Sequence, residues 1–231
     1  MSIHSRTFLT LAACCALALP GCDRDHTHEH NHKHTPGSAN EHMHGHDFEE
    51  LTRRFEDPAR DAWQKPDQVL QQLGDLNGKT VADIGAGTGY FSVPLARAGA
   101  RVIALDVDDR FLDYLRERKA KENVDNLEIR KTGMERPDLA AGEVDLIILA
   151  NVYHHIEGRE AYFKAARAAL KPGGQLVIID FKQDGEHPVG PPPRHRLAAR
   201  TVQSELTGAG YSGFAVNAEL LPYQYILTAS P

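Results

Sequence analysis

The stretch that decides the fold of this chain is Val81-Ala82-Asp83-Ile84-Gly85-Ala86-Gly87-Thr88-Gly89. An apolar run leads directly into a loop in which glycine recurs at every second position. Glycine lets the backbone turn tightly and approach a ligand closely. A helix expected over 90–97 would point its free N–H groups toward that loop. The stretch therefore predicts a strand, a ligand-binding loop and a helix in succession.

Strands and helices alternate on both sides of this loop. The expected helices lie at 48–63 (interrupted by Pro58), 69–73, 90–97, 108–121, 160–170 and 197–209. The expected strands lie at 79–83, 101–107, 127–130, 144–150, 175–180, 214–220 and 223–228. Nearly continuous apolar strands that alternate with helices are typical of a parallel sheet covered on both faces. We therefore predict a doubly wound α/β fold, whose ligand lies beyond the carboxyl ends of the strands.

Two nucleotide ligands do not suit the glycine loop. A dinucleotide fingerprint needs a small residue at the position of Tyr90, because the ligand and the helix approach closely there. A triphosphate loop needs glycine five positions before a Gly-Lys-Thr. Gly74 is one residue too close to Gly78-Lys79-Thr80, and that tripeptide precedes the strand instead of following it.

A third ligand, S-adenosylmethionine, fits the loop. Class I methyltransferases carry the pattern Asp83-x-Gly85-x-Gly87-x-Gly89 at this place. The next expected strand reaches Asp106, seventeen positions past Gly89. A carboxylate there can accept both ribose hydroxyls, as it does in dinucleotide folds. The loop, the spaced carboxylate and the alternating elements together favour S-adenosylmethionine.

The chain from about Phe48 to Pro231 resembles the class I methyltransferases, and within them a group of bacterial methyltransferase-domain proteins. The resemblance implies a mostly parallel, Rossmann-like sheet of seven strands with the last strand antiparallel. It is carried by the segments 60–66, 81–92, 152–156, 170–174 and 189–196.

The resemblance also implies roles for individual residues. Asp83 and the three glycines would line the methionine part of the cofactor, although Asp83 could instead only hold the loop. Asp106 would take the ribose, and Val107, Met134 and Glu135 would flank the adenine. A core position is the alternative for Met134. Asn151 would face the methionine end and the acceptor.

The chemistry of methyl transfer needs few protein groups. The cofactor brings an electrophilic methyl group, and the protein aligns the reactants and excludes water. A general base is needed only if the acceptor loses a proton. Side chains after the fourth and fifth expected strands are the catalytic candidates, namely Tyr153, His154, His155, Asp180 and Lys182.

The N-terminus has the pattern of an export signal. Arg6 precedes an apolar run over 8–19 that is too short to span a bilayer. Leu19-Pro20-Gly21-Cys22 resembles the lipobox of bacterial lipoproteins, with Pro20 as a departure from it. We expect a signal peptide over 1–21 and a lipid anchor on Cys22. The chain would then be periplasmic and membrane-anchored, with a cytoplasmic location as the alternative.

A histidine-rich segment over 22–47 separates the signal from the folded domain over 48–231. It offers almost nothing apolar to bury, so we expect a disordered tether. Alternating imidazoles can surround one metal ion, and they suit Zn, Ni or Cu. The candidate ligands are His26, His28, His30, His32, His34, His42, His44 and His46.

The charge and the cysteine content exclude some classes of partner and of catalytic group. The formal net charge is −6 and there is no long basic run, which argues against a nucleic-acid partner. All cysteines lie in the first 22 residues, so the domain has no thiolate nucleophile. We predict a methyltransferase with a small-molecule or envelope-associated acceptor, in contact with a membrane only through Cys22. The alternative is an exported metal-binding protein that reuses the fold.

Overall fold

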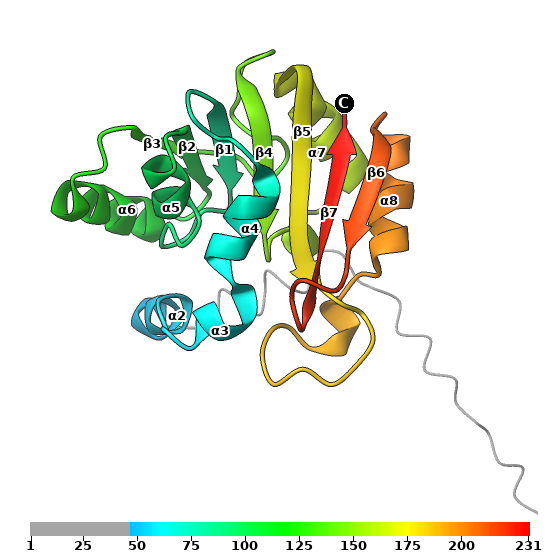
Figure 1. Ribbon diagram of the computed structural model, residues 1–231, viewed down its shortest axis with the longest axis horizontal. Coiled ribbons are helices and arrows are strands. Elements are labelled where there is room, and N and C mark those ends of the chain that lie inside the picture. The colour runs from blue at the N-terminus through cyan, green and yellow to red at the C-terminus, as the bar shows by residue number, and fades with distance from the viewer. Residues whose placement is uncertain (1–46) are drawn as a thin grey trace, which may run out of the picture. The chain divides into compact units, whose positions relative to one another are not determined.

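The computed structural model describes residues 47–231, and the structural statements below concern these residues. Seven strands form one sheet in the order β3-β2-β1-β4-β5-β7-β6 (Figure 1). The strands are β1 (Thr80–Ile84), β2 (Arg101–Asp106), β3 (Leu127–Lys131), β4 (Val144–Ala150), β5 (Leu170–Phe181), β6 (Ser212–Asn217) and β7 (Gln224–Ser230). The helices are α2 (Phe48–Phe55), α3 (Arg60–Gln64), α4 (Pro66–Leu73), α5 (Ser92–Arg97), α6 (Asp109–Glu122), α7 (Arg159–Ala169) and α8 (Ala199–Gly208).

The strand directions confirm the predicted fold class. Strands β3, β2, β1, β4 and β5 pair in parallel. Strand β7 runs antiparallel to both β5 and β6. The chain order reverses between β1 and β4, so the loops after these two strands lie at the switch point where open α/β sheets bind ligands.

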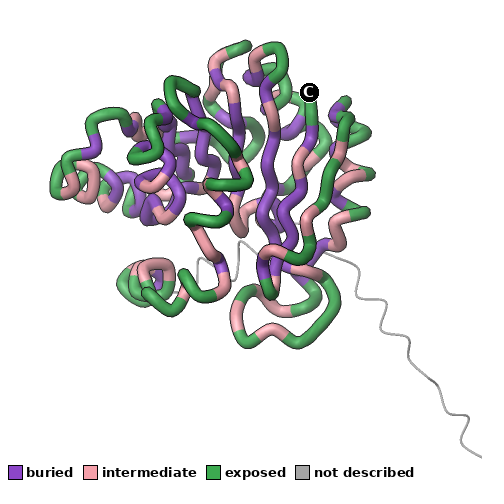
Figure 2. The backbone as a smooth tube through the Cα atoms, in the orientation of Figure 1, coloured by how far each residue is buried: buried purple, intermediate pink, exposed green. Residues whose placement is uncertain are grey.

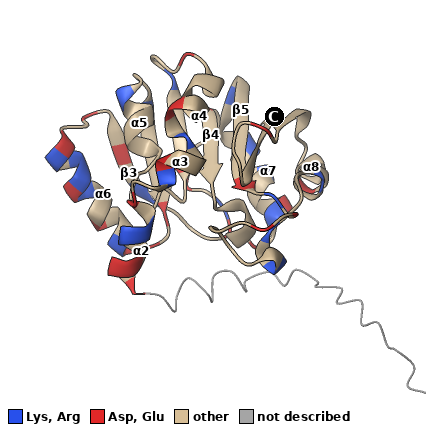
Figure 3. Ribbon diagram, turned by 60° about the horizontal axis from the view of Figure 1, so that its bottom comes forward, with Lys and Arg blue, Asp and Glu red and all other residues tan. Residues whose placement is uncertain are grey.

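Side chains of a strand point alternately to opposite faces of the sheet. The buried strands therefore present apolar side chains on both faces, and helices cover both. Helices α4, α5 and α6 pack on one face, against Val81 and Val102 among others. Helices α7 and α8 pack on the other face, against Ala82 and Ile103. The central strands are buried along their length, as Figure 2 shows. Most charged residues belong to the helices and the connecting loops (Figure 3).

The segment before the sheet is broken where the sequence predicts. Pro58 separates α2 from α3, because proline cannot continue a helix and disfavours helix at the residue before it. Lys65 adopts a left-handed conformation with φ 45° between α3 and α4. The chain therefore forms three short helices, α2, α3 and α4, before it enters β1 at Thr80.

Element ends differ from the predictions by a few residues. The expected strand over 214–220 is shorter and begins earlier, as β6 (Ser212–Asn217). Its exposed edge position gives few buried side chains to mark its ends in the sequence. No helix within residues 47–231 has the length and apolar character needed to cross a membrane.

Candidate functional site

The glycine loop joins β1 to the helical segment that leads into α5. Its glycines have positive φ values, +71° at Gly85, +55° at Gly87 and +86° at Gly89. At Gly85 there is also no space for a side chain, because a Cβ atom would lie 2.5 Å from Cγ2 of Val152. Positive φ and close packing together require glycine at this position.

Asp106 lies directly against this loop. Its Oδ2 atom accepts a hydrogen bond from the Gly87 backbone N–H at 2.8 Å, and Oδ1 accepts one from Asp108 at 3.0 Å. Burial raises the pKa of Asp106, while these backbone donors act in the opposite direction. A carboxylate has about four acceptor positions, so Asp106 keeps acceptor capacity for ribose hydroxyls. The ribose role itself stays a prediction.

A buried hydroxyl gives an independent sign that the loop binds a polar ligand. Thr88 lies between Gly87 and Gly89 and is only 1 % exposed. Its Oγ1 atom has no hydrogen-bond partner among the described residues. Buried polar groups are nearly always paired in proteins. The glycine cradle, the Asp106 carboxylate and this orphaned hydroxyl together fit S-adenosylmethionine.

Asp83, at the end of β1, has a partner inside the protein. Its Oδ2 atom accepts a 2.6 Å hydrogen bond from the Ser92 hydroxyl. Burial raises the pKa of Asp83 to about 6, although Ser92 and the positive charge of Arg60 oppose this. The contact with Ser92 joins the strand to α5 across the loop. It supports the loop-holding role, and a direct cofactor contact stays a prediction.

Arg60 is a site residue that the sequence reasoning did not single out. Its guanidinium lies 3.7 Å from the centre of the Tyr90 ring and donates to the Phe55 carbonyl at 3.0 Å. It also donates to Gln64 Oε1 at 3.1 Å. Burial lowers the pKa of Arg60 to about 10, so the group is still cationic at neutral pH. Only its place in the segment 60–66 could have marked it.

Asn151 follows β4 in a left-handed conformation with φ 64°. Its side chain belongs to a ring of three amides with Gln64 and Gln224, and both glutamines are fully buried. Asn151 donates to Gln64 Oε1 at 3.3 Å, and Gln64 donates to Gln224 Oε1 at 2.7 Å. Gln224 donates back to Asn151 Oδ1. This amide ring ties α3 to the carboxyl end of β4 and to the start of β7.

The predicted adenine side is open to solvent. Val107 is 45 % exposed and Met134 is 51 % exposed. The alternative that Met134 is a core residue is therefore wrong, because the β3–β4 connection carries it away from the sheet. Met134 and Glu135 line an open hollow of ≈ 520 Å³. Neither Val107 nor the glycine loop lines this hollow, and the adenine contacts stay predictions.

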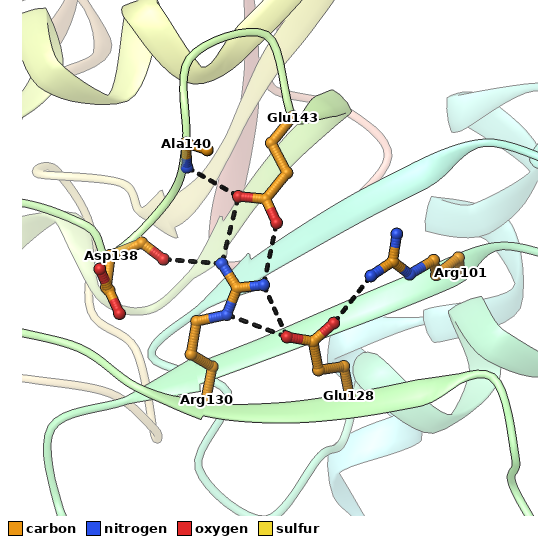
Figure 4. Close-up of polar contacts among 6 residues, drawn as sticks. All are labelled: Arg101, Glu128, Arg130, Asp138, Ala140 and Glu143. Atoms are coloured by element: carbon orange, nitrogen blue, oxygen red, sulfur yellow. Dashed lines mark hydrogen bonds and ion pairs between the residues drawn. The ribbon is translucent and has the colours of Figure 1, made fainter.

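A charge cluster anchors the connection that carries Met134 (Figure 4). Arg130 on β3 donates to both carboxylate oxygens of Glu143, at 2.9 and 3.1 Å, and to the Asp138 carbonyl at 2.9 Å. Its side chain also pairs with Glu128 at 2.6 Å, which in turn pairs with Arg101. Arg130 therefore links the middle and the end of the connection to the edge strand β3.

The predicted catalytic residues have different surroundings. Tyr153 is fully buried, and its hydroxyl donates to Glu205 at 2.6 Å. It stacks on Phe163 within the α7–α8 core, which gives it a packing role. His154, in contrast, contacts Asp180 on β5 at 2.9 Å. The ring of His155 lies 4.3 Å from that of His154.

Aromatic side chains from three segments meet beside the amide ring. Trp63 on α3 lies 5.8 Å from Phe181 and 6.4 Å from Tyr223, measured between ring centres. His187, on the connection after β5, lies 5.5 Å from Tyr223. Arg196 donates to the carbonyls of Pro191 and Gly185, and so links separate parts of that connection.

Several predictions lie outside the described residues. They are the signal peptide over 1–21, the anchor at Cys22 and the eight histidines of the tether. Within residues 47–231, no three His, Cys, Asp or Glu side chains form a group that could hold a metal ion.

Comparison with known proteins agrees with this geometry. Residues 82–178 match the family model described as a methyltransferase domain. A SAM dependent methyltransferase from Aquifex aeolicus has a similar structure, with a TM-score of 0.72 and 28 % sequence identity over 80 % of this chain and 98 % of that one. Both the fold and the match over residues 82–178 thus resemble S-adenosylmethionine-dependent methyltransferases.

Other similar proteins share only part of their length with this chain. A ubiquinone biosynthesis O-methyltransferase of Acinetobacter baumannii (strain AYE) is 33 % identical over 119 residues, which is 50 % of this chain and 49 % of that protein. The chain thus spans about half the length of the curated relatives it matches. Haemonchus contortus phosphoethanolamine N-methyltransferase 2, solved with S-adenosyl-L-methionine, shares the fold at a TM-score of 0.58 and 20 % identity, over 67 % of this chain and 38 % of that one.

Proposed function

We propose that this protein transfers the methyl group of S-adenosylmethionine to a small-molecule acceptor. The observation that carries the proposal is the arrangement around the glycine loop. Three glycines, a buried carboxylate that accepts from the loop itself, and an orphaned threonine hydroxyl meet at the switch point of the sheet. These groups suit a ligand with ribose hydroxyls and a flexible polar tail.

Each part of the site would hold a different part of the ligand. Asp106 would bind the ribose, Val107, Met134 and Glu135 the adenine, and the glycine loop the methionine part. Arg60 adds a half-buried cation near the loop, where a ligand carboxylate would be stabilised. When bound, the cofactor supplies an electrophilic methyl group, and the chain contributes alignment and exclusion of water.

The acceptor is expected on the side of Asn151 and the aromatic cluster of Trp63, Phe181, Tyr223 and His187. The relatives named O-methyltransferases support an oxygen acceptor. A small molecule is favoured over nucleic acid by the net charge of −6.

Calorimetry with S-adenosylhomocysteine tests the cofactor assignment on the full chain. Asp106→Ala removes a carboxylate that would bind two hydroxyls, and charged hydrogen bonds contribute about 1.5–3 kcal/mol each. We expect affinity to fall at least about 10-fold. The matched control is Asp113→Asn on α6, whose side chain is 71 % exposed and whose change should leave affinity unaltered. Absence of binding by the unmodified chain would refute the proposed function.

For the N-terminal 47 residues we propose export, lipid anchoring at Cys22 and metal binding by the alternating histidines. The support is the sequence pattern alone. A metal-binding envelope protein is therefore the second candidate function. Zinc and nickel titrations of the full chain and of a chain without residues 26–46 test it. Equal binding by the two chains would contradict a tether site.

A further inference from the structure

His154 and Asp180 form a buried pair at the carboxyl edge of the sheet. His154 lies on a short 3₁₀ helix (Tyr153–His155) after β4, and Asp180 is the penultimate residue of β5. Their side chains are 3 % and 0 % exposed. Nδ1 of His154 lies 2.9 and 3.0 Å from the two carboxylate oxygens of Asp180.

The contacts of Asp180 determine which ring nitrogen carries the proton. An ionised carboxylate only accepts hydrogen bonds, so Nδ1 of His154 must be the donor. The Asp180 carboxylate also accepts from the backbone N–H groups of Phe181 at 2.8 Å and of His154 at 3.3 Å, which holds it in place. Nε2 then carries the lone pair, and it is the ring nitrogen that can accept a proton.

The pair lies on segments that adjoin the strand leading into the glycine loop. Strands β4 and β5 are neighbours in the sheet, and β4 also pairs with β1, which leads into the loop. Val152, two residues before His154, packs so closely on Gly85 that no side chain fits there. Asn151, the residue expected to face the transferred methyl group, is three positions before His154.

We propose that His154 is the general base of the reaction and that Asp180 is its positioning residue. The acceptor would therefore be a hydroxyl that loses its proton during methyl transfer. The acceptor oxygen bonds to the methyl carbon, the carbon–sulfur bond breaks with its electron pair on sulfur, and the hydroxyl proton passes to Nε2. The resulting imidazolium is stabilised by Asp180. This inference rests on the proposed function and deepens it.

Few other titratable groups face the pair. Tyr225 on β7 is directly opposite Asp180 in the sheet register. Burial raises the pKa of Tyr225, and the charges of Asp180 and Glu205 raise it further, so it stays neutral. Tyr153 behaves in the same way because it is buried and bonded to Glu205. His155 is the other imidazole in contact with His154.

The first test measures the tautomer of His154 by ¹⁵N NMR of the full chain labelled at histidine, with His154→Gln for assignment. We expect the Nδ1–H form in the unmodified chain near neutral pH. Asp180→Asn should abolish the preference, and Asp184→Asn, an exposed residue of the same segment, should keep it. An Nε2–H tautomer in the unmodified chain overturns the proposal whether or not an acceptor is methylated.

The second test compares two hydroxyl probes of different acidity, catechol and 4-nitrocatechol, with radiolabelled S-adenosylmethionine. A general base contributes about 10²–10⁴-fold, so His154→Gln should slow catechol methylation by about that factor. The nitrocatechol hydroxyl ionises without help at mildly alkaline pH, so its loss should be much smaller. Equal losses on both probes would show a structural role and overturn the proposal.

Different results would refute the methyltransferase proposal and the general-base proposal. If S-adenosylhomocysteine does not bind the full chain, the proposed function is wrong. If it binds and His154→Gln leaves its affinity unchanged, a selective loss on catechol supports the general base. Methylation of a thiol or an amine probe that is insensitive to His154→Gln would overturn the hydroxyl assignment while the methyltransferase assignment stands.

Discussion

The contact between Gly85 and Val152 gives a prediction whose size can be worked from the structure. In Gly85→Ala the new Cβ atom would lie 2.5 Å from Cγ2 and 2.9 Å from Cγ1 of Val152. Valine is stiff at χ1, so it cannot rotate away at low cost. Overpacking of this kind costs about 1–3 kcal/mol. The positive φ of +71° adds about 1–2 kcal/mol for a residue with a side chain.

We therefore expect Gly85→Ala to lower the free energy of unfolding by about 2–5 kcal/mol. The matched control is Gly173→Ala, because Gly173 has a φ of +76° but no atom within 4 Å of the added Cβ. That variant should show only the backbone cost of about 1–2 kcal/mol. Val152→Ala added to Gly85→Ala removes both close methyl groups and should restore most of the difference.

Urea unfolding followed by circular dichroism measures the unmodified chain and all three variants. The difference between Gly85→Ala and Gly173→Ala isolates the packing cost, because the unfolded chains change in the same way. Equal losses in these two variants, or no recovery in the double variant, would refute the reasoning that Val152 leaves no space for a side chain at position 85.

Three further predictions concern other parts of the site. Asp83 has a pKa raised from 3.8 to about 6, so the native state binds the extra proton between these values and stability should fall by about 3 kcal/mol as pH rises from 4 to above 6; urea unfolding of Asp83→Asn should lack this decline, and a decline of equal size would contradict the assignment. Arg130→Met should release the β3–β4 connection and weaken S-adenosylhomocysteine binding in calorimetry by about 1 kcal/mol, whereas Arg97→Met, which breaks an exposed pair with Glu122, should not change affinity. Gln64→Leu leaves buried amide groups unpaired and should cost about 1–3 kcal/mol in thermal unfolding, while Gln64→Leu with Gln224→Leu should cost less than the sum of the single changes; strict additivity would show that the amide ring is not coupled.

The order of elements was predictable because the central strands are mostly apolar and buried. Strand β4 has the same bounds in the prediction and in the structure, Val144–Ala150, since a run that is apolar except for Asp145 is bounded by polar residues. The edge strand β6 was placed less well because its side chains are mostly exposed. Exposure weakens the alternating pattern on which strand prediction depends.

The candidate site was predictable where backbone geometry leaves a mark in composition. Glycines at 85, 87 and 89 are visible in the sequence because positive φ disfavours other residues there, and close packing excludes a side chain at 85 and 89 as well. Asp106 was visible through its fixed spacing from the loop. Arg60 and Gln224 were not, because neither belongs to a local pattern, and each reaches the site only through contacts with distant segments.

The sequence by itself determined the α/β class, the S-adenosylmethionine motif and its place after β1, because periodicity and glycine spacing are local properties. The tertiary structure alone decided what the histidines after β4 can do. Tyr153, His154 and His155 are consecutive, yet Tyr153 bonds to Glu205 in the α7–α8 core, while His154 meets Asp180. Those partners lie 52 and 26 positions away, and only the pairing of strands and the packing of helices on the sheet bring them together.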